Sequence, residues 1–371
     1  MAPKRDFKHI IKPITSYLRE IDITLFATVV AISLFGIINM YGISGSSGSY
    51  VAKQITIVAI GIFAMIFFSF FNYRYLKNYS FPVLVLYGVS LILLGVTLYT
   101  GTIRGVSSWI KIGSFTMEPS ELAKLALIIL MAKYFSQRHI HINQIRHIII
   151  SGLYYAVPVL IIMAQPDLGS AIIFSAIWFG VLLASGINKR QLFLLAIIGI
   201  IIAGSLWLFV LKPYQKDRLE SFLDPHNDPQ GAGYNLIQSK IAIGSGYLFG
   251  SGLGKGTQTK LGFLPEPRND FVFASVGEQF GLVGMGLILA AIIIIISRVL
   301  AIGEGANNNF GRLFSLGVAI FIFFHAIIGA SVNIGLMPVT GIPFPFLSYG
   351  GSNLISIMIG LGILQSIKRY G

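Results

Sequence analysis

The sequence contains no cysteine and few charged residues. Of its 371 residues, 11% are charged and only 14 are Asp or Glu. The absence of cysteine excludes disulfide bonds, thiolate catalysis and a metal site with cysteine ligands. The low charged fraction, together with 55% hydrophobic residues and a mean hydropathy of +0.78, excludes an ordinary soluble domain.

The sequence contains many long apolar runs. A membrane-spanning helix needs about 20 apolar residues, and the sequence supplies about ten such runs. Runs of this length favour helices over a barrel of short alternating strands, because backbone groups in lipid must be paired within the segment. We therefore expect an all-α polytopic membrane protein with about ten transmembrane helices, forming one integral membrane domain over residues 1–371. The expected spans are 22–41, 54–71, 81–99, one opening at Pro119, one ending near Ala164, 168–185, one ending near Leu211, 271–297, 313–334 and one ending at Lys368.

The distribution of basic residues predicts the orientation in the membrane. Residues 1–21 are polar and basic, which indicates a cytoplasmic tail and no cleavable signal peptide. Ten spans put both termini on one side, and the short loops on that side hold most of the Lys and Arg, so that side is cytoplasmic. The formal charge of +13 fits this topology and anionic lipid better than nucleic acid. The one long loop, residues 212–269 between the seventh and eighth spans, then faces outside; within it, 235–243 is an amphipathic helix candidate.

The eighth span begins at an acidic residue. On a helix starting there, Asp270, Ala274 and Glu278 share one face at i, i+4 and i+8. Carboxylates at membrane depth are costly and usually mark a polar cavity or a reaction site. Asp270 is therefore the first candidate for chemistry, with Glu278 about two turns farther in.

Other polar residues lie at the outer ends of the expected spans. Glu121 and Lys124 are three residues apart on the fourth span, either as a neutralising ion pair or as a cavity-facing pair. Asp167 lies in a very short turn, where it caps a helix, lines a cavity mouth, or does both. Arg268 and Lys240 are nearby cations. His325 in the ninth span is expected to be packed rather than catalytic. Together the outer residues suit a lipid-linked anionic substrate.

Several motifs give the chain a clear resemblance to the SEDS family (shape, elongation, division and sporulation). The motifs are Pro119-Ser120-Glu121-Leu122-Ala123-Lys124, Gln165-Pro166-Asp167-Leu168-Gly169, Asp224-Pro225 leading to Gly231-Ala232-Gly233-Tyr234, residues 238–246, residues 264–271, and residues 338–352. The stretch Gly254-Lys255-Gly256-Thr257-Gln258 is similar to the elongation members rather than the division members.

The resemblance implies a ten-helix fold and glycosyltransferase activity that polymerises lipid II into peptidoglycan during cell elongation. In this family the acid matching Asp270 is the proposed catalytic residue, and Glu121, Lys124 and Asp167 match polar cavity residues. It also implies the bacterial inner membrane, a class B penicillin-binding protein and other elongation proteins as partners. One departure concerns Ser108, which precedes Trp109 where relatives usually carry a basic residue; Arg104 or Lys111 are the alternative cations.

The expected mechanism makes Asp270 the general base for a sugar hydroxyl, with Lys124, Lys240, Arg268 or a divalent cation stabilising the leaving diphosphate. Mg²⁺ or Mn²⁺ is the expected cation, because carboxylates and phosphates are its usual ligands. No organic cofactor is expected. Two other hypotheses stay open: a flippase that uses Glu121, Asp167 and Glu278 as proton relays, and a non-catalytic scaffold of the elongation machinery.

Overall fold

The computed structural model describes residues 20–45, 48–99, 108–112, 115–137, 145–210, 216, 220–224 and 232–371. Most of the expected tail, parts of the long loop and Arg104 lie outside these ranges. The long helices are α2 (Ile23–Ser44), α3 (Gly48–Phe70), α5 (Ser80–Thr97), α6 (Pro119–Ser136), α7 (Ile145–Ala164), α8 (Leu168–Ala184), α9 (Lys189–Ser205), α13 (Val272–Glu304), α14 (Asn309–Ile334) and α15 (Gly351–Tyr370). The shorter elements are α4 (Arg74–Asn78), the π-helix η3 (Leu206–Val210), α11 (Ala232–Ser245), α12 (Thr257–Lys260) and the strands β1 (Ile110–Ile112) and β2 (Phe115–Met117).

The chain is mostly helical, as predicted, and its long helices fall on the expected apolar runs. By length and composition, six of the described helices could cross a membrane, namely α2, α3, α5, α7, α13 and α14, and α8 is apolar but shorter. This confirms a multi-pass membrane protein, while the number of ten spans stays a prediction. The antiparallel hairpin of β1 and β2, in which Ile110 pairs with Met117, was not expected.

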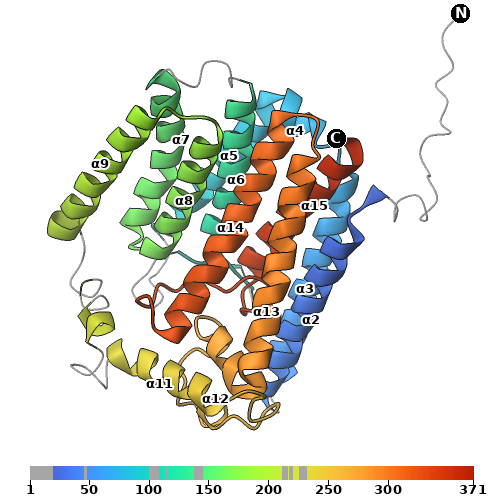
Figure 1. The fold of residues 1–371 in the computed structure, drawn as a ribbon, viewed down its shortest axis with the longest axis vertical. Coiled ribbons are helices and arrows are strands. Elements are labelled where there is room, and N and C mark those ends of the chain that lie inside the picture. The colour runs from blue at the N-terminus through green and yellow to red at the C-terminus, as the bar shows by residue number, and fades with distance from the viewer. Residues whose placement is uncertain are drawn as a thin grey trace, which may run out of the picture.

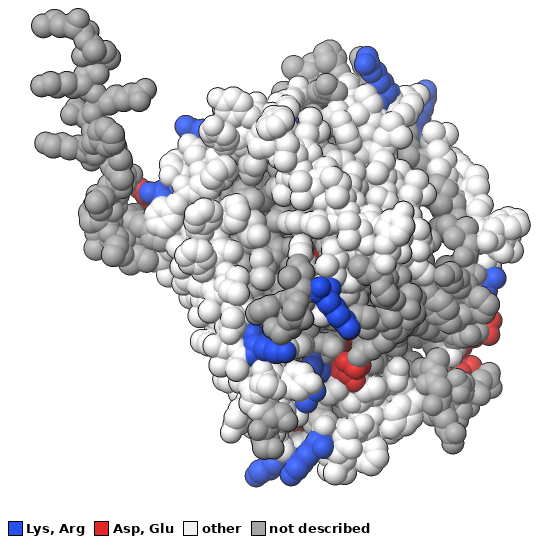
Figure 2. Space-filling view, turned by 180° about the vertical axis from the view of Figure 1, so that it is seen from behind, with Lys and Arg blue, Asp and Glu red and all other residues white. Residues whose placement is uncertain are grey.

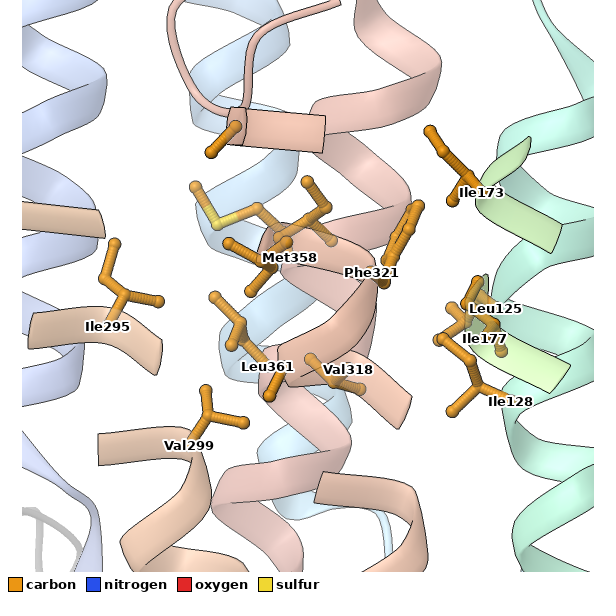
Figure 3. Packing of buried hydrophobic residues seen from close by; sticks show 14 of the residues in the cluster. Leu125, Ile128, Ile173, Ile177, Ile295, Val299, Val318, Phe321, Met358 and Leu361 are labelled. Atoms are coloured by element: carbon orange, nitrogen blue, oxygen red, sulfur yellow. The ribbon is translucent and has the colours of Figure 1, made fainter. Parts of the chain in front are cut away.

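The helices run roughly side by side along the long axis of the molecule (Figure 1). α14 lies in the middle, with α13, α15, α2 and α3 on one side and α6, α8 and α7 on the other, while α9 stands at the outer edge. The shared core is apolar: Val318 and Phe321 of α14 face Leu361 of α15 and the helices that carry Ile128 and Ile295 (Figure 3). α11 and α12 cover one end of this bundle.

A broad surface without charged side chains agrees with a membrane location. On the face shown in Figure 2, Lys, Arg, Asp and Glu gather near the top and in the lower part of the view, with an uncharged stretch between them. Large apolar side chains are exposed on many helices, for example Phe63, Phe81 and Ile293. Exposed apolar side chains of this kind are stable when lipid covers them.

At the end of the bundle that holds the C-terminus, one buried carboxylate joins three helices. Asp22 caps α2 by accepting a hydrogen bond from the Leu25 amide at 2.9 Å. The same carboxylate pairs with Arg298 of α13 and, at 3.1 Å, with Lys368 of α15. Although burial by itself would raise the pKa of Asp22, the Arg298 guanidinium, the Leu25 amide and Lys368 lower it to about 2. This cluster fixes α2, α13 and α15 relative to one another.

Helix α13 is not continuous. Gly281 has φ +67° and ψ −164°, which separates a first part, residues 272–280, from a longer second part. The loop after α11 fills the gap: the amides of Ser251 and Gly252 donate to the carbonyls of Glu278 and Gln279, and the amides of Leu282 and Val283 donate to the carbonyls of Tyr247 and Leu248. The sequence analysis expected one uninterrupted span here, which is wrong.

Candidate functional site

Asp270 lies in a turn immediately before α13 and not on the helix itself. The helix begins at Val272, and Phe271 has non-helical backbone angles. The predicted shared face of Asp270 and Glu278 is therefore wrong, because the chain has no helical register between 270 and 272. Asp270 is half-buried. Its backbone carbonyl accepts a hydrogen bond from Asn333 Nδ2 at 2.8 Å, so α14 holds this turn in place.

The segment Pro343–Asn353 packs against the Asp270 turn. The Ser348 hydroxyl donates to the carbonyl of Asn269 at 2.8 Å, and the Tyr349 amide donates to the carbonyl of Arg268 at 2.7 Å. The Arg268 guanidinium lies 4.2 Å from the centre of the Tyr50 ring, and Tyr50 meets Tyr349 edge to face. Arg268 Nε has no hydrogen-bond partner among the described residues. The Arg268 guanidinium is thus oriented by the Tyr50 ring, and its buried Nε–H is left without a hydrogen-bond partner in the described part of the chain.

Glu121 and Lys124 form a buried ion pair at 2.7 Å. Glu121 Oε2 also accepts from Asn353 Nδ2 at 2.9 Å, and Lys124 Nζ lies 3.4 Å from His325 Nε2. His325 Nδ1 lies 3.1 Å from the carbonyl of Pro343. All four side chains are at most 4% exposed. The ion pair is therefore one part of a four-residue network, and Pro343 and Asn353 join it to the segment that contacts the Asp270 turn.

Sequence reasoning missed two members of this network. His325 is packed, as expected, but its ring faces the Glu121–Lys124 pair, and Asn353 was not singled out. One signal was present: a histidine and an asparagine inside apolar runs are costly unless they meet other polar groups. Which polar groups they meet depends on how α6, α14 and α15 pack, which a single sequence does not reveal.

Asp167 caps α8, with its Oδ1 accepting from the Ser170 amide at 3.0 Å. It also lines a cavity of about 940 Å³ whose other walls are mostly apolar residues of α7, α8 and α9. Asp167 therefore both caps a helix and lines a cavity, which is one of the alternatives predicted from the sequence. Ser170 Oγ lies 3.4 Å from Ser120 Oγ, which places this turn beside the start of α6.

Glu278 has a different environment from the one expected. Its carboxylate is fully buried and accepts hydrogen bonds from the amides of Gln258, at 2.6 Å, and Thr259, at 3.0 Å. A Cβ on Gly256 would clash with this carboxylate. Glu278 therefore holds the first turn of α12 against α13.

Lys240 lies at the C-terminal end of α14. A Cβ on Gly335, which closes that helix with a positive φ, would meet Lys240 Nζ at 2.8 Å. A cation at this position interacts favourably with the helix C-terminus. Lys111, one of the two alternative cations for the hairpin region, is exposed on β1, and Ser108 is buried.

The described residues contain no group of three or more His, Asp or Glu that could hold a metal ion. The side chains of the described residues therefore do not form a metal cage by themselves. The divalent cation stays a prediction.

Comparisons with known proteins agree with the resemblance. The family model described as "Cell cycle protein", FtsW/RodA/SpoVE, matches residues 16–371. The chain is 34% identical over 351 residues to peptidoglycan glycosyltransferase MrdB of Escherichia coli K12, covering 95% of this chain and 94% of that protein. It is 34% identical over 359 residues to stage V sporulation protein E of Bacillus subtilis, covering 94% and 97%.

Solved structures show the same fold. A chain from a peptidoglycan synthase complex that coordinates polymerization and crosslinking superposes with a TM-score of 0.80 at 31% identity, covering 94% of this chain and 98% of that one. Thermus thermophilus rod shape determining protein RodA superposes with a TM-score of 0.69 at 27% identity, covering 94% and 97%. The sequence match and the fold lead to one conclusion: this multi-pass membrane protein belongs to the FtsW/RodA/SpoVE family.

Proposed function

We propose that the chain is a peptidoglycan glycosyltransferase that polymerises lipid II at the outer face of the bacterial cytoplasmic membrane, with both termini cytoplasmic. One observation carries the proposal: the segment Pro343–Asn353 joins the Asp270 turn to the buried Glu121–Lys124–His325–Asn353 network. Relatives at 34% identity named peptidoglycan glycosyltransferase support the reaction class.

In the proposed reaction, the Asp270 carboxylate accepts the proton of the 4-hydroxyl of the acceptor GlcNAc. The hydroxyl oxygen attacks C1 of the donor MurNAc, the bond from C1 to the diphosphate oxygen breaks, and undecaprenyl diphosphate leaves with the electron pair. Displacement at an α-linked diphosphate gives a β-1,4 bond. A positioned base contributes about 10²–10⁴-fold to the rate, and holding donor and acceptor in line adds to this.

The leaving diphosphate needs positive charge, and Arg268 supplies it in this proposal. Its guanidinium lies against Tyr50 beside the Asp270 turn, and its Nε has no hydrogen-bond partner among the described residues. Guanidinium groups bind phosphate oxygens in a planar, directed geometry. Lys124 forms an ion pair with Glu121, which in turn accepts a hydrogen bond from Asn353. In this proposal the main effect of Lys124 is therefore to fix the segment that supports Arg268.

The decisive experiment compares purified wild-type protein with Asp270→Asn in detergent, with labelled lipid II as substrate. We expect a rate at least 100-fold lower for Asp270→Asn, because the base is lost while the side-chain shape remains. Glu304→Gln is the matched control, because Glu304 is an exposed carboxylate at the far end of α13. Polymer at the wild-type rate from Asp270→Asn would remove Asp270 from the role of base.

The same assay separates the enzyme from the two other hypotheses. A flippase or a scaffold gives no polymer in detergent micelles, which do not separate two compartments. The relay expected for a flippase also loses one member, because the Glu278 carboxylate is bound to two backbone amides.

We further propose a class B penicillin-binding protein as partner, since a structural neighbour belongs to a complex that coordinates polymerization and crosslinking. Co-purification of the chain with its cognate transpeptidase tests this.

A further inference from the structure

A second cavity lies between α3 and the first turns of α6 and α15. Its volume is about 470 Å³. One part is apolar, lined by Ile57, Ile60, Leu122, Ile355 and Ile359. The other part is polar, lined by Lys53, Thr116, Glu118, Tyr349 and Ser352. A cavity of this shape fits an amphiphile with a hydrocarbon chain and a polar head.

Glu118 is the buried carboxyl group of this cavity. The residue is 7% exposed, and its Oε1 accepts a hydrogen bond from the Ser120 hydroxyl at 2.8 Å. Its backbone amide donates to Ser352 Oγ at 2.8 Å, which ties the start of α6 to the start of α15. Glu118 also lines the cavity. Ionising a carboxyl group that is buried to this degree is costly unless cations or hydrogen-bond donors compensate for the lost water.

The charges around Glu118 favour the protonated form. Burial comes first, followed by the nearby Glu121 carboxylate, and Asp167 at the start of α8 acts in the same direction. Lys124 and the Ser120 hydroxyl oppose them but do not cancel them. The pKa of Glu118, which lies just before α6, is thereby raised to about 8. Lys53 of α3 and Tyr349 are the other titratable groups that line the cavity, and His325, which does not line it, lies 3.6 Å from Glu121.

The polar end of the cavity is suited to an anion. α6 begins at Pro119 and α15 at Gly351, and both helix N-termini border the cavity through Glu118 and Gly350. Helix N-termini favour negative charge, and Lys53 adds a full positive charge at the same end. An ionised Glu118 would repel an anionic head there. A neutral carboxylic acid donates a hydrogen bond to it instead.

We propose that Glu118 binds substrate as a neutral carboxylic acid, donating its O–H to a phosphate oxygen of an isoprenoid-linked diphosphate whose chain lies along the apolar part of this cavity. The inference rests on the proposed function, because lipid II supplies the isoprenoid and the diphosphate. It adds a binding residue to that reaction and explains why an acid next to Glu121 is compatible with an anionic substrate.

The test measures equilibrium binding of fluorescent lipid II from pH 6 to pH 9. Two proteins are compared, and both carry Asp270→Asn so that turnover does not consume the ligand. One keeps Glu118, and the other also carries Glu118→Gln. With Glu118, the dissociation constant is expected to rise about tenfold between pH 7 and pH 9, because the protonated fraction falls about tenfold. With Glu118→Gln, which keeps a donor but does not titrate, the dissociation constant is expected to stay within about twofold.

Two further arms make the result specific. Phosphatidylglycerol as competitor distinguishes an isoprenoid diphosphate from an ordinary phospholipid, and undecaprenol, which lacks phosphate, is expected to compete equally at all pH values. Thermal unfolding of each variant checks that it is folded. Identical pH profiles for Glu118 and Glu118→Gln, or phosphatidylglycerol competing as well as undecaprenyl diphosphate, would overturn the inference. Polymer formed in the Asp270→Asn background would instead count against Asp270 as base, so the two failures are distinguishable.

Discussion

Asn333 on α14 holds the backbone on both sides of the start of α13. Its Nδ2 donates to the carbonyl of Asp270 and its Oδ1 accepts from the amide of Ala274, each at 2.8 Å. The side chain thus caps α13 from a neighbouring helix, at the place where Phe271 offers no side-chain cap. The position of the proposed base therefore depends on a residue 63 positions away in the sequence.

Asn333→Ala tests this dependence. The substitution removes the partners of the buried Ala274 amide and of the partly buried Asp270 carbonyl, and we expect a loss of about 1–3 kcal/mol in stability. The polymerisation rate should fall more than stability alone explains, because the Asp270 turn loses its anchor. Asn307→Ala, which removes an exposed asparagine at the other end of α14, is the control. Wild-type turnover by folded Asn333→Ala would show that Asp270 is positioned by other contacts.

Gly281→Ala tests the break in α13. Gly281 has φ +67°, and a Cβ there would meet the carbonyl carbon of Leu248 and the amide of Gly250 at 2.5 Å. We expect a large decrease in the melting temperature, because both the backbone angle and the contact are unfavourable. Gly286→Ala on the same helix has open space around its Cβ and should be neutral or more stable by about 0.5–1 kcal/mol. Equal melting temperatures for the two variants would contradict this account.

A double-mutant cycle tests the Glu121–Lys124 pair. Glu121→Gln and Lys124→Met each leave an unpaired buried charge, and each is expected to cost about 3–5 kcal/mol. The double variant should be more stable than either single variant, because it removes both charges. Thermal unfolding in detergent measures all four proteins, with Lys189→Met as an exposed control for loss of a cation. Additive losses in the double variant would mean that the two charges do not stabilise each other.

Asp22 predicts a pH dependence of stability. Its folded pKa of about 2 lies below the ordinary value of 3.8, so its contribution is present above pH 3.8 and is lost as the pH falls toward 2. Asp22→Asn keeps a capping side chain and should be about 1–2 kcal/mol less stable at pH 7, since Arg298 and Lys368 are partly exposed and screened. The difference should shrink at pH 2.5. A difference that stays constant with pH would assign the effect to packing instead.

The sequence was sufficient to place most of the long helices. Apolar run length placed α5, α8 and the start of α6 within two residues and α2 within three, because lipid leaves few alternatives to a helix. α3 begins six residues earlier than expected, since the Gly/Ser-rich stretch before it continues as helix. The hairpin and α4 were missed, because each has few residues and depends on contacts with other segments.

The site was harder to derive than the fold. Glu121 and Lys124 could be paired from their spacing, because three residues on one helix fix their relation. Their partners His325 and Asn353 come from α14 and α15, so only the packing reveals them. The burial of Glu118 was not predicted, because it arises from the cavity between three helices. The expectation that Glu278 faces a polar cavity did not anticipate its two backbone partners. Those partners, the amides of Gln258 and Thr259, belong to a segment whose path the sequence does not predict.

At the interruption around Gly281, the carbonyls of Glu278 and Gln279 and the amides of Leu282 and Val283 all form hydrogen bonds with residues 247–252. Residues 272–280 of α13 are consequently positioned by the loop of residues 247–252 and not only by the rest of the helix. Lengthening or shortening that loop should thus retune the geometry around the acid without disturbing how the protein sits in the bilayer.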